Sequence, residues 1–201
     1  MNIQLVAFSG LLLAACVPVH DVYYIPVGGG DVQKQGPCGV NTRRTLYVKI
    51  SSEVSITLDA LSTQTMNAGG TRDRTRLLVT LHIPQNHRVR LESDVLTIEV
   101  REDSSRFSAH ISGISDVAMT NSEAERGAVA PLRELVGTKG VFGGTASATP
   151  SVFQFSVDLP VNEPRSFSVT LPDMTVDGVT SRIKPIEFAL TSGSHWAGLC
   201  Q

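Results

Sequence analysis

The stretch LLVTLHIPQNHRVRLESDVLTIEVREDSSRFSAHI, residues 77–111, decides the fold. Apolar and polar side chains alternate through it in four runs, and short turns separate the runs. Alternation with a period of two indicates β-strands that bury one face and expose the other to water. Two of the turns contain residues typical of turns, in Pro84-Gln85-Asn86 and Glu102-Asp103-Ser104. We therefore predict an antiparallel meander over 77–111.

The same alternation occurs on both sides of this stretch, so we expect about nine antiparallel strands in all. The additional strands are expected at residues 45–50, 54–58, 153–159, 167–171 and 186–190. Pro185 stands at the start of the last of them. Because proline has no N–H to donate to a neighbouring strand, we expect an edge or a bulge at that point.

Strands with one apolar face must bury that face, and the chain has almost no amphipathic helix that could cover it. The expected solution is a second sheet, in a β-sandwich of immunoglobulin-like or transthyretin-like type. A single closed barrel is the alternative. A membrane barrel is disfavoured, because it needs strands of about 9–11 residues and girdles of aromatic side chains. Aromatic residues make up only 5% of this chain.

Two long connections interrupt the regular pattern, at residues 60–76 and 112–151. Loops of this length in a compact domain are usually functional or disordered. In the second loop, Ser122 and Glu125 have the spacing of a capping box, and Pro131–Val136 has the features of a short helix. We therefore predict one or two short helices within this loop.

Length and charge limit the classes of function. The 201 residues suit one good-sized domain, and the formal net charge is −2. A nucleic-acid-binding protein needs a clustered basic surface, which this charge balance does not indicate. We expect no nucleic-acid partner.

The N-terminal segment predicts where the protein is located. Residues 3–15, IQLVAFSGLLLAA, contain no charge, and they are too few to cross a bilayer, which takes about 20 residues. The run fits the apolar region of a secretory signal. The small residues Ala14 and Ala15 precede Cys16, as a cleavage site prefers. The sequence Leu13-Ala14-Ala15-Cys16 resembles the lipobox of bacterial lipoprotein precursors.

This resemblance covers residues 1–16 and implies a lipid anchor. In that class the cysteine thiol, here that of Cys16, receives a diacylglycerol, the signal 1–15 is removed, and the new amine is acylated, for example with palmitate. Several acyl chains hold a protein at a membrane, since each buried CH₂ contributes about 0.8 kcal/mol. Val17 stands where an Asp retains such proteins at the inner membrane, so the outer membrane is favoured if the source is Gram-negative. An ordinary signal peptide, with Cys16 incidental, and a buried N-terminal strand are alternatives.

Residues 16–44 are expected to form a flexible tether, and residues 45–201 the β-sandwich domain. The tether is predicted from its prolines and glycines, such as Gly28-Gly29-Gly30, which break regular structure. As an alternative, Tyr23 and Tyr24 dock the early part of this segment on the domain.

If lipid occupies Cys16, the other two cysteines, Cys38 and Cys200, remain as a pair. Exported proteins reside where disulfides form and persist, so we predict a Cys38–Cys200 disulfide that ties both ends of the domain together. A reactive thiol is the alternative, although it would need an activating neighbour.

Three arginines on the Gly-preceded loop 60–76 are the candidate partner-binding residues: Arg72, Arg74 and Arg76. Guanidinium groups on a mobile loop can clamp an acidic protein surface or phosphate groups. A solvated loop without a partner is the alternative.

No spacing in the chain indicates catalysis, a metal or a cofactor. The histidines His82, His87 and His110 lack the spacing of a zinc motif, and we predict His82 and His110 on the solvent side of one sheet. The serines near 111–113 and 192–195 lack the glycine pattern of a nucleophile elbow.

Together these features predict a membrane-anchored lipoprotein of the bacterial cell envelope. Its β-sandwich is expected to bind or scaffold another envelope protein, an inference that rests partly on architecture. The alternatives are an envelope hydrolase with a site not evident in the sequence, and an assembly lipoprotein of a secretion or surface-appendage system. In the last case the sandwich would dock a partner through its loops or an edge strand.

Overall fold

The computed structural model describes residues 18–28, 30–34, 44–62, 74–117, 129–138, 140–142, 145–147 and 151–196. The three cysteines, Arg72 and the capping-box pair Ser122 and Glu125 lie outside these residues. The described part contains seventeen strands and no helix. Every strand pairing within it is antiparallel.

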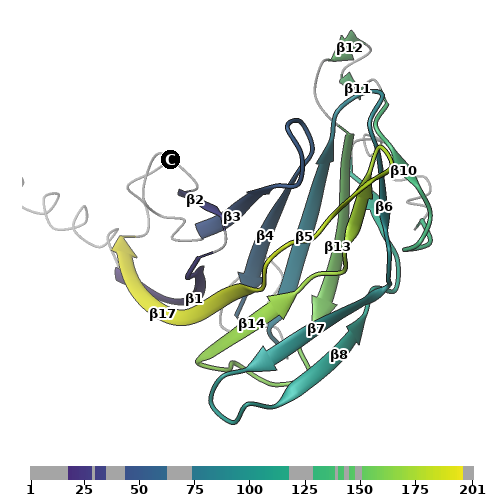
Figure 1. Ribbon diagram of the computed structural model, residues 1–201. Coiled ribbons are helices and arrows are strands. Elements are labelled where there is room, and N and C mark those ends of the chain that lie inside the picture. Colours follow the sequence, from purple (N-terminus) through teal and green to yellow (C-terminus); the bar gives the residue numbers. More distant parts are fainter. Residues whose placement is uncertain are drawn as a thin grey trace, which may run out of the picture.

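The strands form a β-sandwich, whose two layers are visible in Figure 1. The back layer consists, in spatial order, of β2 (Asp31–Lys34), β3 (Arg44–Lys49), β4 (Ser55–Leu61), β5 (Arg76–Ile83), β13 (Ser151–Asp158) and β9 (Ser115–Asp116). The front layer begins with a sheet of β1 (Pro18–Pro26), β17 (Ile186–Trp196), β14 (Ser166–Thr170), β7 (Val95–Val100) and β8 (Arg106–His110).

A smaller sheet extends the front layer. It consists of β10 (Leu135–Val136), β6 (Arg88–Leu91), β15 (Met174–Val176) and β16 (Val179–Ser181). The two sheets are joined because β6 leads into β7 and β14 into β15, and the Glu92 N–H donates to the Asp173 carbonyl at 2.9 Å between them. A separate hairpin pairs β11 (Gly140–Phe142) with β12 (Thr145–Ser147).

One apolar core lies between the layers, and the period-two pattern explains it. On β5 the side chains alternate between buried and half-buried along the whole strand. Leu81 of the back layer and Ile98 of the front layer are completely buried and belong to the same cluster. Since burial of apolar area is the main favourable term in folding, this shared core is what holds the two layers together.

The predicted meander over 77–111 is wrong except for its last hairpin. β5 lies in the back layer and β6 in the front layer, so the chain changes layers at the turn 84–87. Only β7 and β8 pair directly with each other. Alternation specifies which face of a strand is buried, and it does not specify the neighbouring strand. The turns themselves are confirmed, since Asn86 (φ 72°) and Ser104 (φ 55°) adopt the left-handed turn conformation.

The segment predicted as a tether, 16–44, differs most from expectation, because residues 18–34 contribute two strands. β1 pairs with β17 at nine successive positions, from Pro18↔Trp196 to Pro26↔Phe188, and β2 pairs with β3. Tyr24 is only 2% exposed, which confirms for this residue the alternative that the early segment docks on the domain. Its prolines and glycines delimit the two strands and do not exclude strands.

Two smaller expectations concern prolines, and the first of them is wrong. Pro131–Val136 forms no helix: a turn is followed by β10, and Leu135 is buried opposite Val89 of β6. Pro185 directly precedes β17, whose first residue, Ile186, pairs with Val169 of β14 only, because the pairing with β1 begins at Phe188. This end of the strand is therefore a local edge, as expected. A position just before the strand needs no ladder hydrogen bond, so proline fits there.

Candidate functional site

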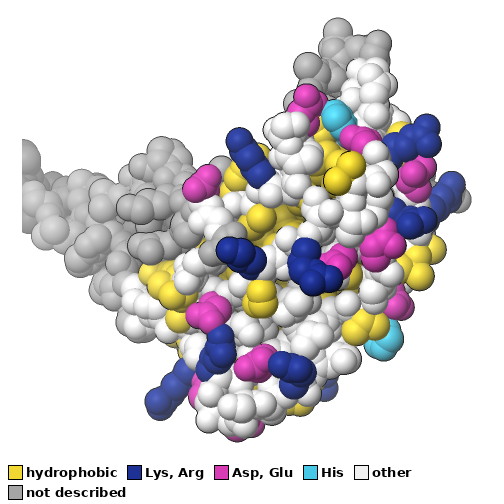
Figure 2. All heavy atoms as spheres, viewed as in Figure 1, with side chains coloured by type: hydrophobic (Ala, Val, Ile, Leu, Met, Phe, Trp, Pro, Cys, Tyr) yellow, Lys and Arg dark blue, Asp and Glu magenta, His cyan; other side chains and the backbone are white. Residues whose placement is uncertain are grey.

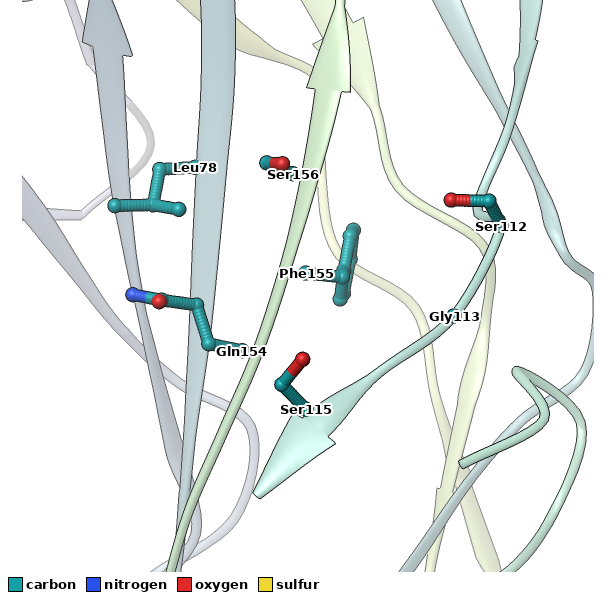
Figure 3. A pocket seen from close by; sticks show the side chains of 7 residues that line it. All are labelled: Leu78, Ser112, Gly113, Ser115, Gln154, Phe155 and Ser156. Atoms are coloured by element: carbon teal, nitrogen blue, oxygen red, sulfur yellow. The ribbon is translucent and has the colours of Figure 1, made fainter. Parts of the chain in front are cut away.

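A cleft of about 290 Å³ opens at the side of the sandwich, beside the part of β13 that does not pair with β9. β9 pairs with β13 at only two positions, Phe153↔Asp116 and Gln154↔Ser115. Just before β9, Ile114 pairs with Val129, so the preceding chain diverges from β13. The space between them, which we call the seam cleft, is lined by Leu78, Ser112, Gly113, Ser115, Gln154, Phe155 and Ser156 (Figure 3).

The backbone of Ser156 faces this cleft. The Leu159 N–H donates to the Thr75 carbonyl at 2.8 Å, so the odd-numbered residues of β13 make the hydrogen bonds to β5. On the opposite edge the Val117 N–H donates to the carbonyl of the even-numbered Val152 at 2.8 Å. The N–H and C=O of Ser156 therefore point away from β5, and no described strand pairs with them.

The seam cleft combines the apolar side chains of Leu78 and Phe155 with serine hydroxyls and the Gln154 amide, and none of these seven lining residues is ionisable. Figure 3 shows the hydroxyl of Ser112 directed toward β13 and that of Ser115 directed into the gap. The Gln154 amide nitrogen donates to Thr80 Oγ1 at 3.1 Å. Nucleophilic catalysis needs a base beside the hydroxyl, and none is among the lining residues. This arrangement suits hydrogen bonding to a polypeptide backbone or to an uncharged polar side chain.

A second cleft, with a larger volume of about 430 Å³, lies on the outer face of the small front sheet. Its charges compensate one another. Glu92 accepts hydrogen bonds from Thr175 Oγ1 at 2.5 Å and from Arg90 at 3.2 Å, and these two bonds lower the pKa of its carboxyl. The Arg88 guanidinium lies 3.3 Å from Glu134.

His87, beside this cleft, joins three connections of the chain. Its Nδ1 lies 2.6 Å from Asp177 Oδ2 and its Nε2 lies 2.7 Å from Glu53 Oε2. Both ring nitrogens donate only in the imidazolium form, so the pKa of His87 is raised, first by Asp177 and then by Glu53. The same contact with His87, together with the Arg88 N–H, lowers the pKa of Asp177.

The His87 bridge predicts a pH dependence. Because the pKa of His87 is raised, its stabilising contribution is complete below about pH 6.5 and is lost as the pH rises through the raised value. The lowered pKa of Asp177 acts in the opposite direction, since that contribution is lost as the pH falls through the lowered value. Asp177→Asn should lower the His87 pKa more than Glu53→Gln does, as imidazole NMR titrations would measure. Identical titrations of wild type and Asp177→Asn would contradict the bridge.

The predicted arginine cluster is only partly described. Arg76 is the first residue of β5 and not a loop residue, and its guanidinium forms two hydrogen bonds with Asp158 on β13, at 2.5 and 3.1 Å. This contact raises the pKa of Arg76. Arg74 is exposed just before the strand. A role for Arg72, Arg74 and Arg76 in partner binding stays a prediction.

The other histidines lie apart. His82 is half-buried on β5, where burial lowers its pKa, whereas His110 is exposed on β8 of the other layer. The expectation that they share one sheet is therefore wrong. Across the described ranges no group of three or more His, Cys, Asp or Glu side chains is arranged to hold a metal ion.

The face in view in Figure 2 shows positive and negative side chains interspersed, with no large area of one sign. Across the front sheet Arg106 is paired with Glu99 at 3.1 Å, and Arg101 with Glu187. None of the described residues forms a helix that is long and apolar enough to span a membrane.

Sequence reasoning did not find the seam cleft. Ser112 and Gly113 belong to the serine-containing stretch that lacks the pattern of a nucleophile elbow, and Gln154 and Ser156 are polar residues of the strand expected at 153–159. The cleft exists because β9 ends after two residues, and no local pattern signals that end. Neither a family model, nor a curated protein, nor a solved structure matches this chain.

Proposed function

We propose that this chain is a lipid-anchored protein of the bacterial cell envelope whose β-sandwich binds another protein, as a docking or scaffolding module. The observation that carries the binding part is the seam cleft. It combines the backbone groups of Ser156, which no described strand pairs with, with serine hydroxyls and an amide, and its seven described lining residues include no acid or base. Such a site can recognise a polypeptide by hydrogen bonds.

The anchoring part rests on the lipobox sequence that ends at Cys16. Since β1 begins at Pro18, only Val17 separates the lipid-bearing residue from the first strand. A protein anchored in this way would hold its sandwich close to the membrane surface. The Cys38–Cys200 disulfide belongs to the same proposal, because an oxidising envelope would allow it to form.

The anchor is tested by producing the full-length chain and its Cys16→Ser variant in a Gram-negative host. We expect the wild type in the membrane fraction, labelled by a palmitate analogue. The variant should be unlabelled and released, because it lacks the thiol that accepts the lipid. An unlabelled wild type, or a variant that stays in the membrane fraction, would refute lipidation.

The binding part is tested with a photo-crosslinking amino acid at position 156 of the same full-length chain. Position 170 is the matched control, since Thr170 is also exposed on a strand but lies on β14, inside the front sheet. We expect a discrete adduct with one envelope protein from position 156 and none from position 170. Equal adducts, or none from either position, would argue against docking at the seam.

A further inference from the structure

Among the strands that the structure describes, β8, next to the seam cleft, is an edge of the front sheet. It pairs with β7 on one side and stands last in the spatial order of its sheet. The Val100 N–H donates to the Ser105 carbonyl at 2.9 Å and the Ile111 N–H to the Asp94 carbonyl at 2.8 Å. Odd-numbered residues of this segment thus face β7, and the backbone groups of the even-numbered residues point outward: Arg106, Ser108 and His110.

β8 differs from the other described edge strands. β1 has proline at both ends, β9 and β10 have two residues each, and β11, β12 and β16 have three each. β2 has four residues, and its first and last residues, Asp31 and Lys34, are charged. β8 has five residues and no proline. Edge strands of native proteins are usually protected from pairing with another chain by short length, proline or charged side chains. Of these three features β8 has only the charged side chains.

The charged side chains of β8 do not cover its outward edge. Arg106 Nη2 lies 3.1 Å from Glu99 Oε2, and His110 Nδ1 lies 3.4 Å from Asp94 Oδ2. Glu99 belongs to β7 and Asp94 directly precedes it, so both side chains of β8 point back toward β7 and away from the outward edge. Ser108, small and exposed, occupies the middle of the strand between them.

We propose that β8 accepts an extended segment of a partner protein as an added antiparallel strand, hydrogen-bonded to the backbone of Arg106, Ser108 and His110. The proposal rests on the proposed function and names the binding mode. The chain runs from the end of β8 directly into Ser112 and Gly113 of the seam cleft, so the added strand and the cleft form one continuous surface. Strand addition gains affinity from main-chain bonds and specificity from alternate side chains.

The side chains and backbone groups of β8 predict which residues the added strand should contain. Arg106 and His110 each have side chains that are 70% exposed and lie on the same face of β8. Although Glu99 lies 3.1 Å from the Arg106 guanidinium, this group is 70% exposed and permanently charged, so an acidic residue opposite it on the added strand is favoured and a basic one is repelled. The segment must also lack proline at the positions that face β8, because each of those positions donates an N–H.

A second copy of this chain does not fit the same edge. A two-fold axis at Ser108 would place Arg106 of one copy opposite His110 of the other at both ends of the pair. Neither of these side chains supplies a carboxylate for the other, so the pairing gains no ion pair. The surface therefore fits a foreign acidic strand better than self-association.

The test uses the full-length chain in detergent and a phage library of random nine-residue peptides, selected for binding to the wild type. Ser108→Pro removes the outward N–H and leaves the hydrogen bonds to β7 in place, and Ser108→Ala is the matched control that keeps the N–H. We expect acidic, proline-poor peptides whose affinity falls at least about tenfold with Ser108→Pro and stays unchanged with Ser108→Ala.

Two further measurements do not depend on how well Ser108→Pro folds. N-methylation of a selected peptide should weaken binding at every second position, since only those amides would face β8. Amide exchange of Ser108 should be fast in the free protein and slow in the complex, whereas Phe107 should be slow in both.

The outcomes separate this proposal from the proposed function. Peptides that lose affinity with Ser156→Pro and not with Ser108→Pro would place docking on β13, which overturns the assignment to β8 and keeps a binding module. Selection of no peptide, or of peptides that bind all variants equally, would overturn strand addition. Loss of lipidation in the Cys16→Ser experiment would affect only the anchor.

Discussion

Tyr24→Ala should lower the free energy of unfolding by about 3–5 kcal/mol, as other deletions of buried aromatic rings do. The ring is 2% exposed and packs edge-on against Phe167, with 5.1 Å between ring centroids, and Phe167 in turn stacks on Phe188. The Tyr24 hydroxyl donates to the Pro164 carbonyl at 2.9 Å, and burial raises the pKa of this hydroxyl. The substitution would therefore open a cavity and leave the Pro164 carbonyl without its donor.

This experiment distinguishes a strand of the sandwich from a tether. Thermal or urea unfolding of the full-length chain measures the loss, which corresponds to roughly 10 °C in Tm for a domain of this size. Tyr24→Phe should cost only about 1–2 kcal/mol, because it removes the hydrogen bond and keeps the ring. Tyr23, which is less buried on the opposite face of β1, supplies the control Tyr23→Ala. Equal, small losses from Tyr24→Ala and Tyr23→Ala would mean that β1 does not stabilise the domain.

Gly137→Ala should destabilise the domain by about 2–3 kcal/mol, a typical cost of forcing atoms into a packed site. A Cβ at this position would lie 1.8 Å from the Pro84 carbonyl oxygen and 2.8 Å from that of Ile83. Both are backbone atoms, so the turn itself would have to move. Gly137 also holds that turn through two hydrogen bonds: its N–H donates to the His87 carbonyl at 2.9 Å, and its carbonyl accepts from the Asn86 N–H at 3.2 Å.

The displaced turn contains His87, so the same variant should also lower the His87 pKa toward its usual value near 6.5. Urea unfolding and an imidazole titration measure the two effects on one sample. Gly178→Asn is the control, because a Cβ at Gly178 meets nothing within 4 Å and Asn tolerates its positive φ of 85°. We expect that control to cost less than about 1 kcal/mol. A stable Gly137→Ala protein with an unchanged His87 titration would show that the contact with Pro84 relaxes freely.

Much of the architecture was predictable because its signals are local. Alternation identified β5, β7 and β13 and the side of each that is buried, since side-chain direction in a strand depends only on odd and even position. The turns at Asn86 and Ser104 were predictable for the same reason, because Asn tolerates the left-handed conformation that Asn86 adopts and the Asp103 carboxylate accepts a hydrogen bond from the Ser105 N–H, as Asp does in turns.

Strand pairing was not predictable, because it depends on which distant segments compete for each edge. β6 pairs with β10 and β15, segments that lie more than forty residues away in either case, and not with β5 or β7. β1 was hidden among turn residues and becomes a strand because β17 extends past β14 and offers it an edge. The bridge at His87 likewise joins Glu53 and Asp177, which are 34 and 90 positions away.

The sequence by itself determined the all-β class, the faces that form the core and the resemblance to a lipoprotein signal at Cys16. These depend on short-range patterns, which any chain segment carries with it. Only the tertiary structure decided that β9 stops after two residues, that Ser156 faces a cleft and that β8 ends its sheet. An edge or a cleft is a place where a neighbour is missing, and which neighbour a strand has depends on how the whole chain packs.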